Sequence, residues 1–111
     1  MGERKGPFAG IRIFDLTSVL FGPYAAQILG DWGADVIKIE TLEGDTWRYC
    51  GQFRNHGMSG QFMAVNRNKR SLALDLKNEK SKARLAPSDP DDRRACHQQP
   101  SCGADPAWLR L

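Results

Sequence analysis

The chain has 111 residues, of which 41% are hydrophobic, and it carries a formal net charge of +3. That length allows one small domain at most. The charge is too small to mark a nucleic-acid binder, which gathers cations over a whole face. No run of about 18 apolar residues is present to span a membrane. We therefore expect neither nucleic acid nor a membrane as a partner.

The three cysteines, Cys50, Cys96 and Cys102, are odd in number and widely spread. This argues against a disulfide framework and suits a reducing cytoplasm. The N-terminus lacks the apolar core of a secretory signal, which also favours a cytoplasmic protein. Cys96 and His97 lie near Cys102, but no second pair stands at zinc-site spacing. We expect no metal.

The first forty residues have the pattern of a strand, a helix and a second strand. Residues 10–16 are typical of a buried strand, and the hydroxyls at 17–18 are suited to cap the helix that follows. The helix is expected to open at Gly22-Pro23, where proline is tolerated, and to close at Gly30 or Gly33. Residues 34–40 are apolar on both faces, as in a parallel sheet. Together they predict a right-handed βαβ unit.

A long loop and a third strand are expected next. Residues 41–65 are rich in glycine and scattered aromatics, which indicates a functional loop. Residues 71–76 alternate leucines with smaller or polar residues, as a strand does. Three cations, Arg67, Lys69 and Arg70, precede this strand and Lys77 follows it. Fixed cations on a rigid element favour a phosphate-bearing ligand, and the alternative is a solvated basic turn before an edge strand.

A dinucleotide site is a weaker alternative. The second strand ends in Glu40, and an acidic residue there can hold a ribose hydroxyl. That site also needs a glycine-rich turn so that the backbone can approach the pyrophosphate. Here residues 16–22 place bulky side chains in the turn. Glu40 is therefore interpreted as a strand-end or interface carboxylate.

Three pieces of the chain together point to a family. They are GIRIFDLTSVLFGPYAAQILGDWGADVIKIE at 10–40, then Gly44-Asp45 with Trp47-Arg48, and NRNKRSLALDLK at 66–77. In this order and spacing they closely resemble the N-terminus of the class III CoA-transferases, such as formyl-CoA:oxalate and carnitine CoA-transferases. The related 2-methylacyl-CoA racemases remain an alternative. The likeness covers roughly residues 9–80.

The resemblance implies an α/β fold, with a Rossmann-like βαβ unit and a third strand in an incomplete parallel sheet. It implies the N-terminal part of an enzyme that moves CoA between an acyl-CoA and a carboxylic acid through an aspartyl intermediate. CoA and acyl-CoA would be substrates, and no tightly bound cofactor is expected. The catalytic aspartate lies beyond the matched segment, so this chain should be inactive alone. The family forms homodimers, which are not expected of this fragment. The other hypothesis is a free-standing CoA- or nucleotide-binding module.

The same resemblance nominates contacts to the adenosine-phosphate end of CoA. Leu20 and Thr41 stand where the family often has polar or cationic residues, so a bidentate arginine contact is missing. Binding would then depend on Lys77 and on the cations before the third strand, although some of these could instead pair with carboxylates such as Asp75 or Glu40. The full candidate set is Leu20, Thr41, Arg67, Lys69, Arg70, Leu74 and Lys77.

The chain divides into three segments. Residues 1–8 are expected to be a flexible N-terminus, and 9–85 a partial CoA-binding domain. Residues 86–111 hold four of the six prolines and none of the Ile, Val, Phe, Met or Tyr of the chain. Such a composition cannot offset chain entropy by burial. We expect a disordered tail, from a frameshift or, alternatively, a natural proline-rich linker.

Overall fold

The computed structural model describes residues 5–85 and 94–97. Its helices and strands follow one another along the chain as β1 (Arg12–Asp15), α1 (Phe21–Asp31), β2 (Asp35–Glu40), η1 (Thr46–Tyr49, a 3₁₀-helix), α2 (Gly60–Asn66), β3 (Lys69–Ala73), α3 (Glu79–Leu85) and β4 (Arg94–His97). The predicted βαβ unit followed by a third strand is confirmed. Within the described residues, no helix is long and apolar enough to cross a bilayer.

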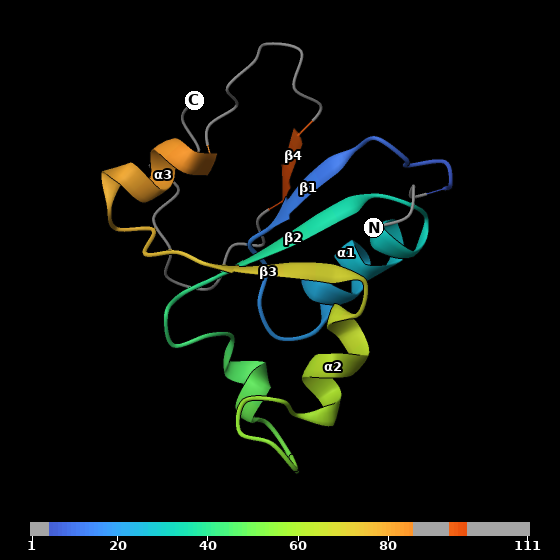
Figure 1. The fold of residues 1–111 in the computed structure, drawn as a ribbon. Coiled ribbons are helices and arrows are strands. Elements are labelled where there is room, and N and C mark those ends of the chain that lie inside the picture. The colour runs from blue at the N-terminus through green and yellow to red at the C-terminus, as the bar shows by residue number, and fades with distance from the viewer. Residues whose placement is uncertain (1–4, 86–93, 98–111) are drawn as a thin grey trace.

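The strands form one sheet in the order β3-β2-β1-β4, with every neighbouring pair parallel (Figure 1). The parallel sheet of an α/β fold is therefore confirmed. The strand β4 was not expected, because it lies in the segment for which the sequence predicted disorder. It pairs with β1 along its whole length. The remainder of that prediction, for 86–93 and 98–111, lies outside the described residues.

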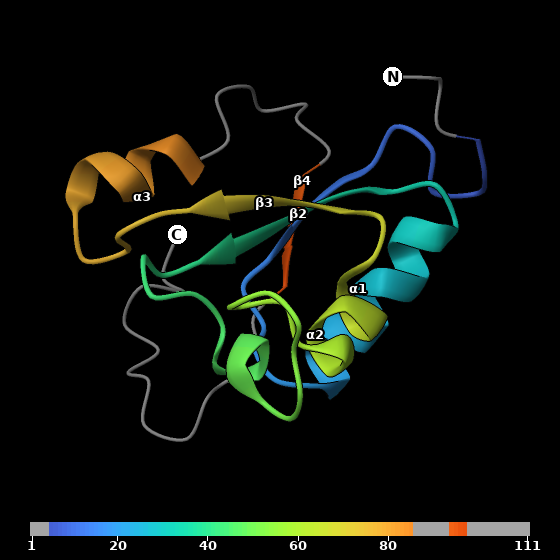
Figure 2. The same cartoon turned by 60° about the horizontal axis from the view of Figure 1, so that its bottom comes forward.

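Helices cover the sheet on both faces (Figure 2), with α1 and α2 on one side and α3 on the other. The alternation of strand side chains decides which residues meet which helix. On the α1 face Ile13 and Val36 pack with Ala26, and on the opposite face Phe14 and Ile39 form a second cluster. Leu85 of α3 packs against that second cluster. The face of β2 that carries Ile37 and Ile39 is apolar, as predicted, but the other face carries the buried Lys38 and Glu40 beside Val36, so the prediction of two apolar faces was wrong.

The expected loop at 41–65 instead contains η1 and most of α2. The helix α2 is capped by Ser59, whose Oγ accepts a hydrogen bond from the backbone N–H of Phe62 at 3.0 Å. Asp45 caps η1 in the same way through the N–H of Trp47 at 2.9 Å. Short capped helices such as these have too few turns to show a periodic apolar pattern.

Two boundaries also differ from expectation. The third strand was expected at 71–76 but spans Lys69–Ala73, so Lys69 and Arg70 belong to the strand itself and Arg67 precedes it. The hydroxyls at 17–18 were expected to cap α1, but its N-cap is Leu20, which makes no side-chain hydrogen bond. Thr17 Oγ1 donates to Asp15 instead. A local bond two residues away competed successfully with the helix terminus.

Candidate functional site at the carboxyl edge of the sheet

The carboxyl ends of β1, β2 and β3 meet at one edge of the sheet, where open α/β sheets commonly bind ligands. Four of the predicted site residues follow these strands. Leu20 lies in the connection after β1, Thr41 directly follows β2, and Leu74 and Lys77 follow β3. The backbone N–H of Leu74 donates to Glu40 O at 2.9 Å, which continues the β2–β3 pairing by one residue. The structure thus brings these four to the same edge.

A cleft of about 310 Å³ opens beside the ends of β2 and β3. Thr41 is the predicted site residue that lines it, because Leu74 is only 7% exposed and packs in the core. Lys77 is exposed outside the cleft and Leu20 is half-buried. The lining residues are Glu40, Thr41, Leu42, Glu43, Gly44, Arg48, Tyr49, His56, Gly57, Met58, Ser71 and Ala73.

Two of the lining residues, Arg48 and Glu40, form an arginine–carboxylate pair. Arg48 Nε and Nη2 donate to the two oxygens of Glu40 at 2.7 and 2.6 Å, and the guanidinium lies 3.9 Å from the ring centre of Phe62. Burial alone would raise the pKa of Glu40, but the hydrogen bonds from Arg48 and from the backbone of Asp45 hold it below its ordinary value. The charges of Arg48 and Glu40 therefore neutralise each other. The cleft offers no free arginine to a ligand within the described residues.

The basic block of Arg67, Lys69 and Arg70, which spans the start of β3, lies at the opposite, amino edge of the sheet. Arg67 Nη2 donates to Asp31 at 2.8 Å, and Arg70 donates to Asp35 through Nε at 3.0 Å and Nη2 at 2.5 Å. The prediction that some of these cations pair with carboxylates is confirmed. The partners named for them, Asp75 and Glu40, were wrong. The sequence pattern could not identify the partners because they come from the end of α1 and the start of β2.

Lys69 is buried, with 2% of its side chain exposed. Its ammonium donates to Asp15 Oδ2 at 2.8 Å, to Pro23 O at 2.7 Å and to Asn66 Oδ1 at 2.9 Å. These bonds use all three donors of a lysine. Burial lowers the pKa of Lys69, and the hydrogen bond and charge of Asp15 oppose that shift. As placed here, Lys69 joins β1, α1 and α2 and has no donor left for a phosphate.

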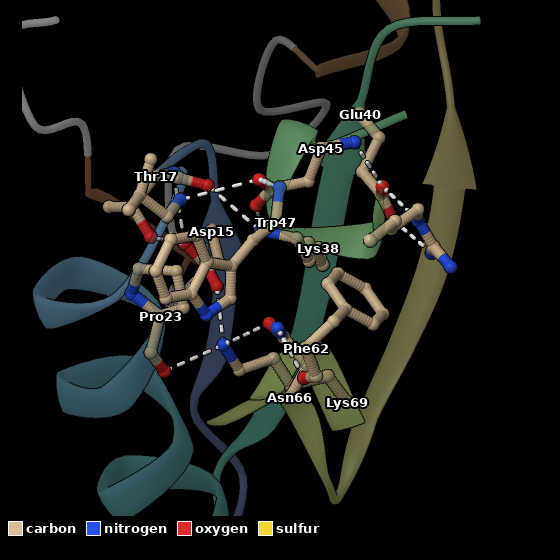
Figure 3. A network of polar contacts seen from close by, with 12 residues as sticks. Asp15, Thr17, Pro23, Lys38, Glu40, Asp45, Trp47, Phe62, Asn66 and Lys69 are labelled. Atoms are coloured by element: carbon tan, nitrogen blue, oxygen red, sulfur yellow. Dashed lines mark hydrogen bonds and ion pairs between the residues drawn. The ribbon is translucent and has the colours of Figure 1, made fainter. Parts of the chain in front are cut away.

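A second buried ion pair, between Lys38 and Asp45, stands beside the first (Figure 3). Lys38 Nζ lies 3.0 Å from Asp45 Oδ2 and donates to Thr17 O at 2.9 Å. Both side chains of the pair are 2% exposed. Sequence analysis missed this pair by interpreting residues 34–40 only through their apolar members. The available signal was that Lys38 and Glu40 share a strand face with Val36.

Asp15 completes the buried network. It accepts hydrogen bonds from Lys69, from Thr17 Oγ1 and from the backbone N–H of Thr17, the last at 3.0 Å. Burial alone would raise the pKa of Asp15, but the hydrogen bonds from Lys69 and Thr17 hold it below its ordinary value. Two ion pairs on adjacent strands thus fix the start of the turn that follows β1.

The described residues contain no group of three or more His, Cys, Asp or Glu able to hold a metal ion. Each described aspartate is an acceptor in an ion pair or a hydrogen bond within the domain: Asp15, Asp31, Asp35, Asp45 and Asp75. The aspartates of the tail lie outside the described residues.

Comparison with known proteins decides the family. Residues 8–86 match the model of "CoA-transferase family III". The chain belongs to this family. It is 45% identical over 84 residues to the succinate–glutarate CoA-transferase of Agrobacterium fabrum, an alignment that covers 69% of this chain and 21% of that protein. It is 48% identical over 73 residues to mouse succinyl-CoA:glutarate CoA-transferase, covering 65% of this chain and 17% of the relative.

Solved structures agree with this assignment. A CaiB/BaiF family protein from Brucella suis superposes with a TM-score of 0.67 at 36% identity, covering 74% of this chain and 23% of the other. A hypothetical protein from Mycobacterium tuberculosis gives a TM-score of 0.64 at 34% identity, covering 76% and 22%. The family III chain described here therefore spans about a fifth of the length of the curated relatives it matches.

Proposed function

We propose that this chain is the N-terminal part of an enzyme that transfers CoA between an acyl-CoA and a carboxylic acid, and that it carries part of the CoA site. The observation that carries the proposal is which basic side chains are already paired with a carboxylate and which are not. Arg67, Lys69 and Arg70 are paired with carboxylates at or near the amino edge or in the interior. Within the described residues Lys77 has no ion-pair partner, and it follows β3 at the carboxyl edge.

The proposed site joins the turns after three adjacent strands. Lys77 supplies the phosphate contact, Thr41 lines the approach, and Leu20 borders it from the turn after β1. Leu74 packs in the core and supports the end of β3 beneath the site. The cleft beside Thr41 takes an uncharged part of the ligand, because Arg48 is neutralised by Glu40. The cations at the amino edge keep the structural role that their ion pairs support.

The chemical step is assigned to a part of the family chain that this sequence does not match. The resemblance implies an aspartate whose carboxylate attacks the acyl-CoA thioester, forms a mixed anhydride and expels the CoA thiolate. The thiolate then attacks the aspartyl carbonyl, which releases the donor carboxylate and leaves an aspartyl-CoA thioester. The names of the relatives, which act on succinyl-CoA with glutarate or mesaconate, favour a small dicarboxylic acid as substrate of the whole protein.

Titration calorimetry with CoA tests the binding role. We expect weak binding that weakens further in Lys77→Ala, with a strong dependence on salt because the contact is electrostatic. Lys80→Ala is the matched control, since Lys80 is also exposed and lies three residues further along. Equal affinities for the wild type, Lys77→Ala and Lys80→Ala would remove Lys77 from the site.

A transfer assay tests the assignment of the chemistry. The purified chain should move no CoA from an acyl-CoA to a carboxylate. Turnover that copurifies with the chain through several steps would contradict the absence of the nucleophile.

One observation favours the second candidate, a free-standing binding module. Ordered structure beyond residue 85 is what a module complete in itself would show, and β4 lies there, paired with β1. The family model ends at residue 86, so this strand is not part of the family match. Comparing the unfolding of the full chain with that of residues 1–85 separates the two. A module requires the tail for stability, whereas a family fragment with an unrelated tail does not.

A further inference from the structure

The turn between β1 and α1, residues 17–20, is held by side chains that come from outside it. Lys38, in the middle of β2, donates to Thr17 O at 2.9 Å. Asp45, which follows β2, accepts from the backbone N–H of Val19 at 3.3 Å. The turn itself supplies the backbone groups, and the neighbouring strand and loop supply the charges.

Val19 has an unusual backbone conformation in this turn. Its φ is 69°, in the left-handed region that β-branched residues rarely adopt. Such a residue persists only where its surroundings hold it, and these positions cluster at ligand sites. Its side chain is exposed, so packing does not explain the conformation. The described contact at its N–H is the bond to Asp45.

Asp45 connects two turns at the carboxyl edge. One oxygen, Oδ1, accepts from Val19 N and from Trp47 N, and the other lies 3.0 Å from Lys38 Nζ. The backbone N–H of Asp45 donates to Glu40 Oε2 at 2.9 Å. A single buried carboxylate thus fixes the turn after β1 relative to the turn after β2, between which the proposed ligand would bind.

We propose that Asp45 is a positioning residue that holds the turn at 17–20 in its left-handed conformation for CoA, with Lys38 fixing the carboxylate. The proposal rests on the proposed CoA site and deepens it, since Asp45 itself makes no contact with the ligand. A purely structural role, as the cap of η1, is the competing explanation. That role predicts a loss of stability without a selective loss of affinity.

Two substitutions of Asp45 separate these roles. Asp45→Asn keeps an oxygen that accepts from Val19 N and Trp47 N but loses the charge that balances Lys38. Asp45→Ala loses both. We expect both variants to lose stability, Asp45→Asn to bind CoA within about twofold of the wild type, and Asp45→Ala to bind at least tenfold more weakly, the fold change expected from loss of a buried hydrogen bond to a charged group. Parallel losses of affinity and stability in both variants would overturn the proposal.

A third variant approaches the same bond from the turn. Val19→Pro removes the N–H and forbids a positive φ, and it leaves the Lys38–Asp45 pair intact. If Asp45→Ala fails to fold, the CoA affinity of Val19→Pro tests the proposal in its place. CoA affinity should fall as in Asp45→Ala, and an affinity equal to that of the wild type would overturn the proposal.

Amide hydrogen exchange separates failure of this proposal from failure of the CoA site. The amide of Val19 should be protected in the wild type and in Asp45→Asn and should exchange freely in Asp45→Ala. If the Val19 amide loses protection in Asp45→Ala as expected but the wild type binds no CoA, the proposed function is refuted. The role of Asp45 in holding the turn would then still stand. Rapid exchange of the Val19 amide in the wild type would show that Asp45 does not hold the turn.

Discussion

At the residue scale, the domain depends on charges placed in its interior. Lys38, Lys69, Asp15 and Asp45 are almost completely buried, and each has a partner of opposite charge. A buried charge costs several kcal/mol unless it is paired and hydrogen-bonded. The sequence reveals that these residues are charged, but which of them meet depends on the register of three strands. That is why the cations could be predicted and their partners could not.

Removing one member of a buried pair should unfold the domain. Lys69→Met keeps the side-chain volume but leaves Asp15 buried without its cation, a change that costs about 3–5 kcal/mol. A domain of this size has about that much stability in total. Far-UV circular dichroism at 25 °C should therefore show a largely unfolded Lys69→Met and an unchanged Lys80→Met control. A folded Lys69→Met would show that the pair contributes little.

Acid should unfold the domain through the same residues. The folded-state pKa values of Asp15 and Glu40 lie below their ordinary values. Groups with lowered pKa values stabilise the folded state above their unfolded pKa, and that contribution disappears as the pH falls toward the folded pKa. Stability should be constant above roughly pH 5 and decline below roughly pH 4.

Tryptophan emission as a function of pH measures this decline, because Trp47 lies beside the network (Figure 3). Glu40→Gln should be less stable than the wild type at neutral pH and should lose less on acidification. An acid transition of the same size in both proteins would assign the pH dependence to other carboxylates.

At the scale of elements, the helices and strands with a repeating apolar pattern could be predicted from the sequence, and the short ones without such a pattern could not. The first strand, α1 and β2 were predicted because their apolar residues recur with the period of a strand or a helix. The helix α2 has seven residues and begins at glycine, so it exists through its cap and its contacts with α1 and η1. The strand β4 forms only by pairing with a segment about eighty residues away, which no local pattern records.

The cap of α2 should therefore be indispensable to that helix. Ser59 is fully buried, and its Oγ both accepts from Phe62 N and donates to Trp47 O at 2.6 Å. Ser59→Ala should lower stability by about 1–2 kcal/mol, the usual cost of losing an N-cap. Thermal unfolding followed by circular dichroism measures the change. Ser18→Ala, at an exposed serine, is the control, and equal midpoints for the two variants would contradict the role of the cap.

At the scale of the whole molecule, large apolar side chains remain exposed. Those on α1 and at its C-cap recur at intervals of three or four residues and so form one stripe along the helix: Phe21, Tyr24, Ile28 and, at the C-cap, Trp32. The first of them is 77% exposed. Small domains bury a low fraction of their surface and are marginally stable, and in the described part of the chain β3 forms an edge of the sheet where another strand can pair.

We therefore predict that the isolated chain is poorly soluble and only marginally stable. Light scattering and dye binding should report association and exposed apolar surface, and a thermal scan should give a broad transition. The contrary outcome is a monodisperse monomer that unfolds sharply and cooperatively. The amides of β4 that pair with β1 should be protected, and the rest of 86–111, for which the sequence predicted rapid exchange, lies outside the described residues.

The proposed CoA site lies at the carboxyl edge of the sheet, and the basic block at the amino edge has a structural role. Hydrogen exchange of the chain with and without saturating CoA tests that placement most directly. It predicts added protection in the turns at 17–20, 41–44 and 74–77, and no change at 67–70. Protection centred on 67–70, with none in the three turns, would contradict it.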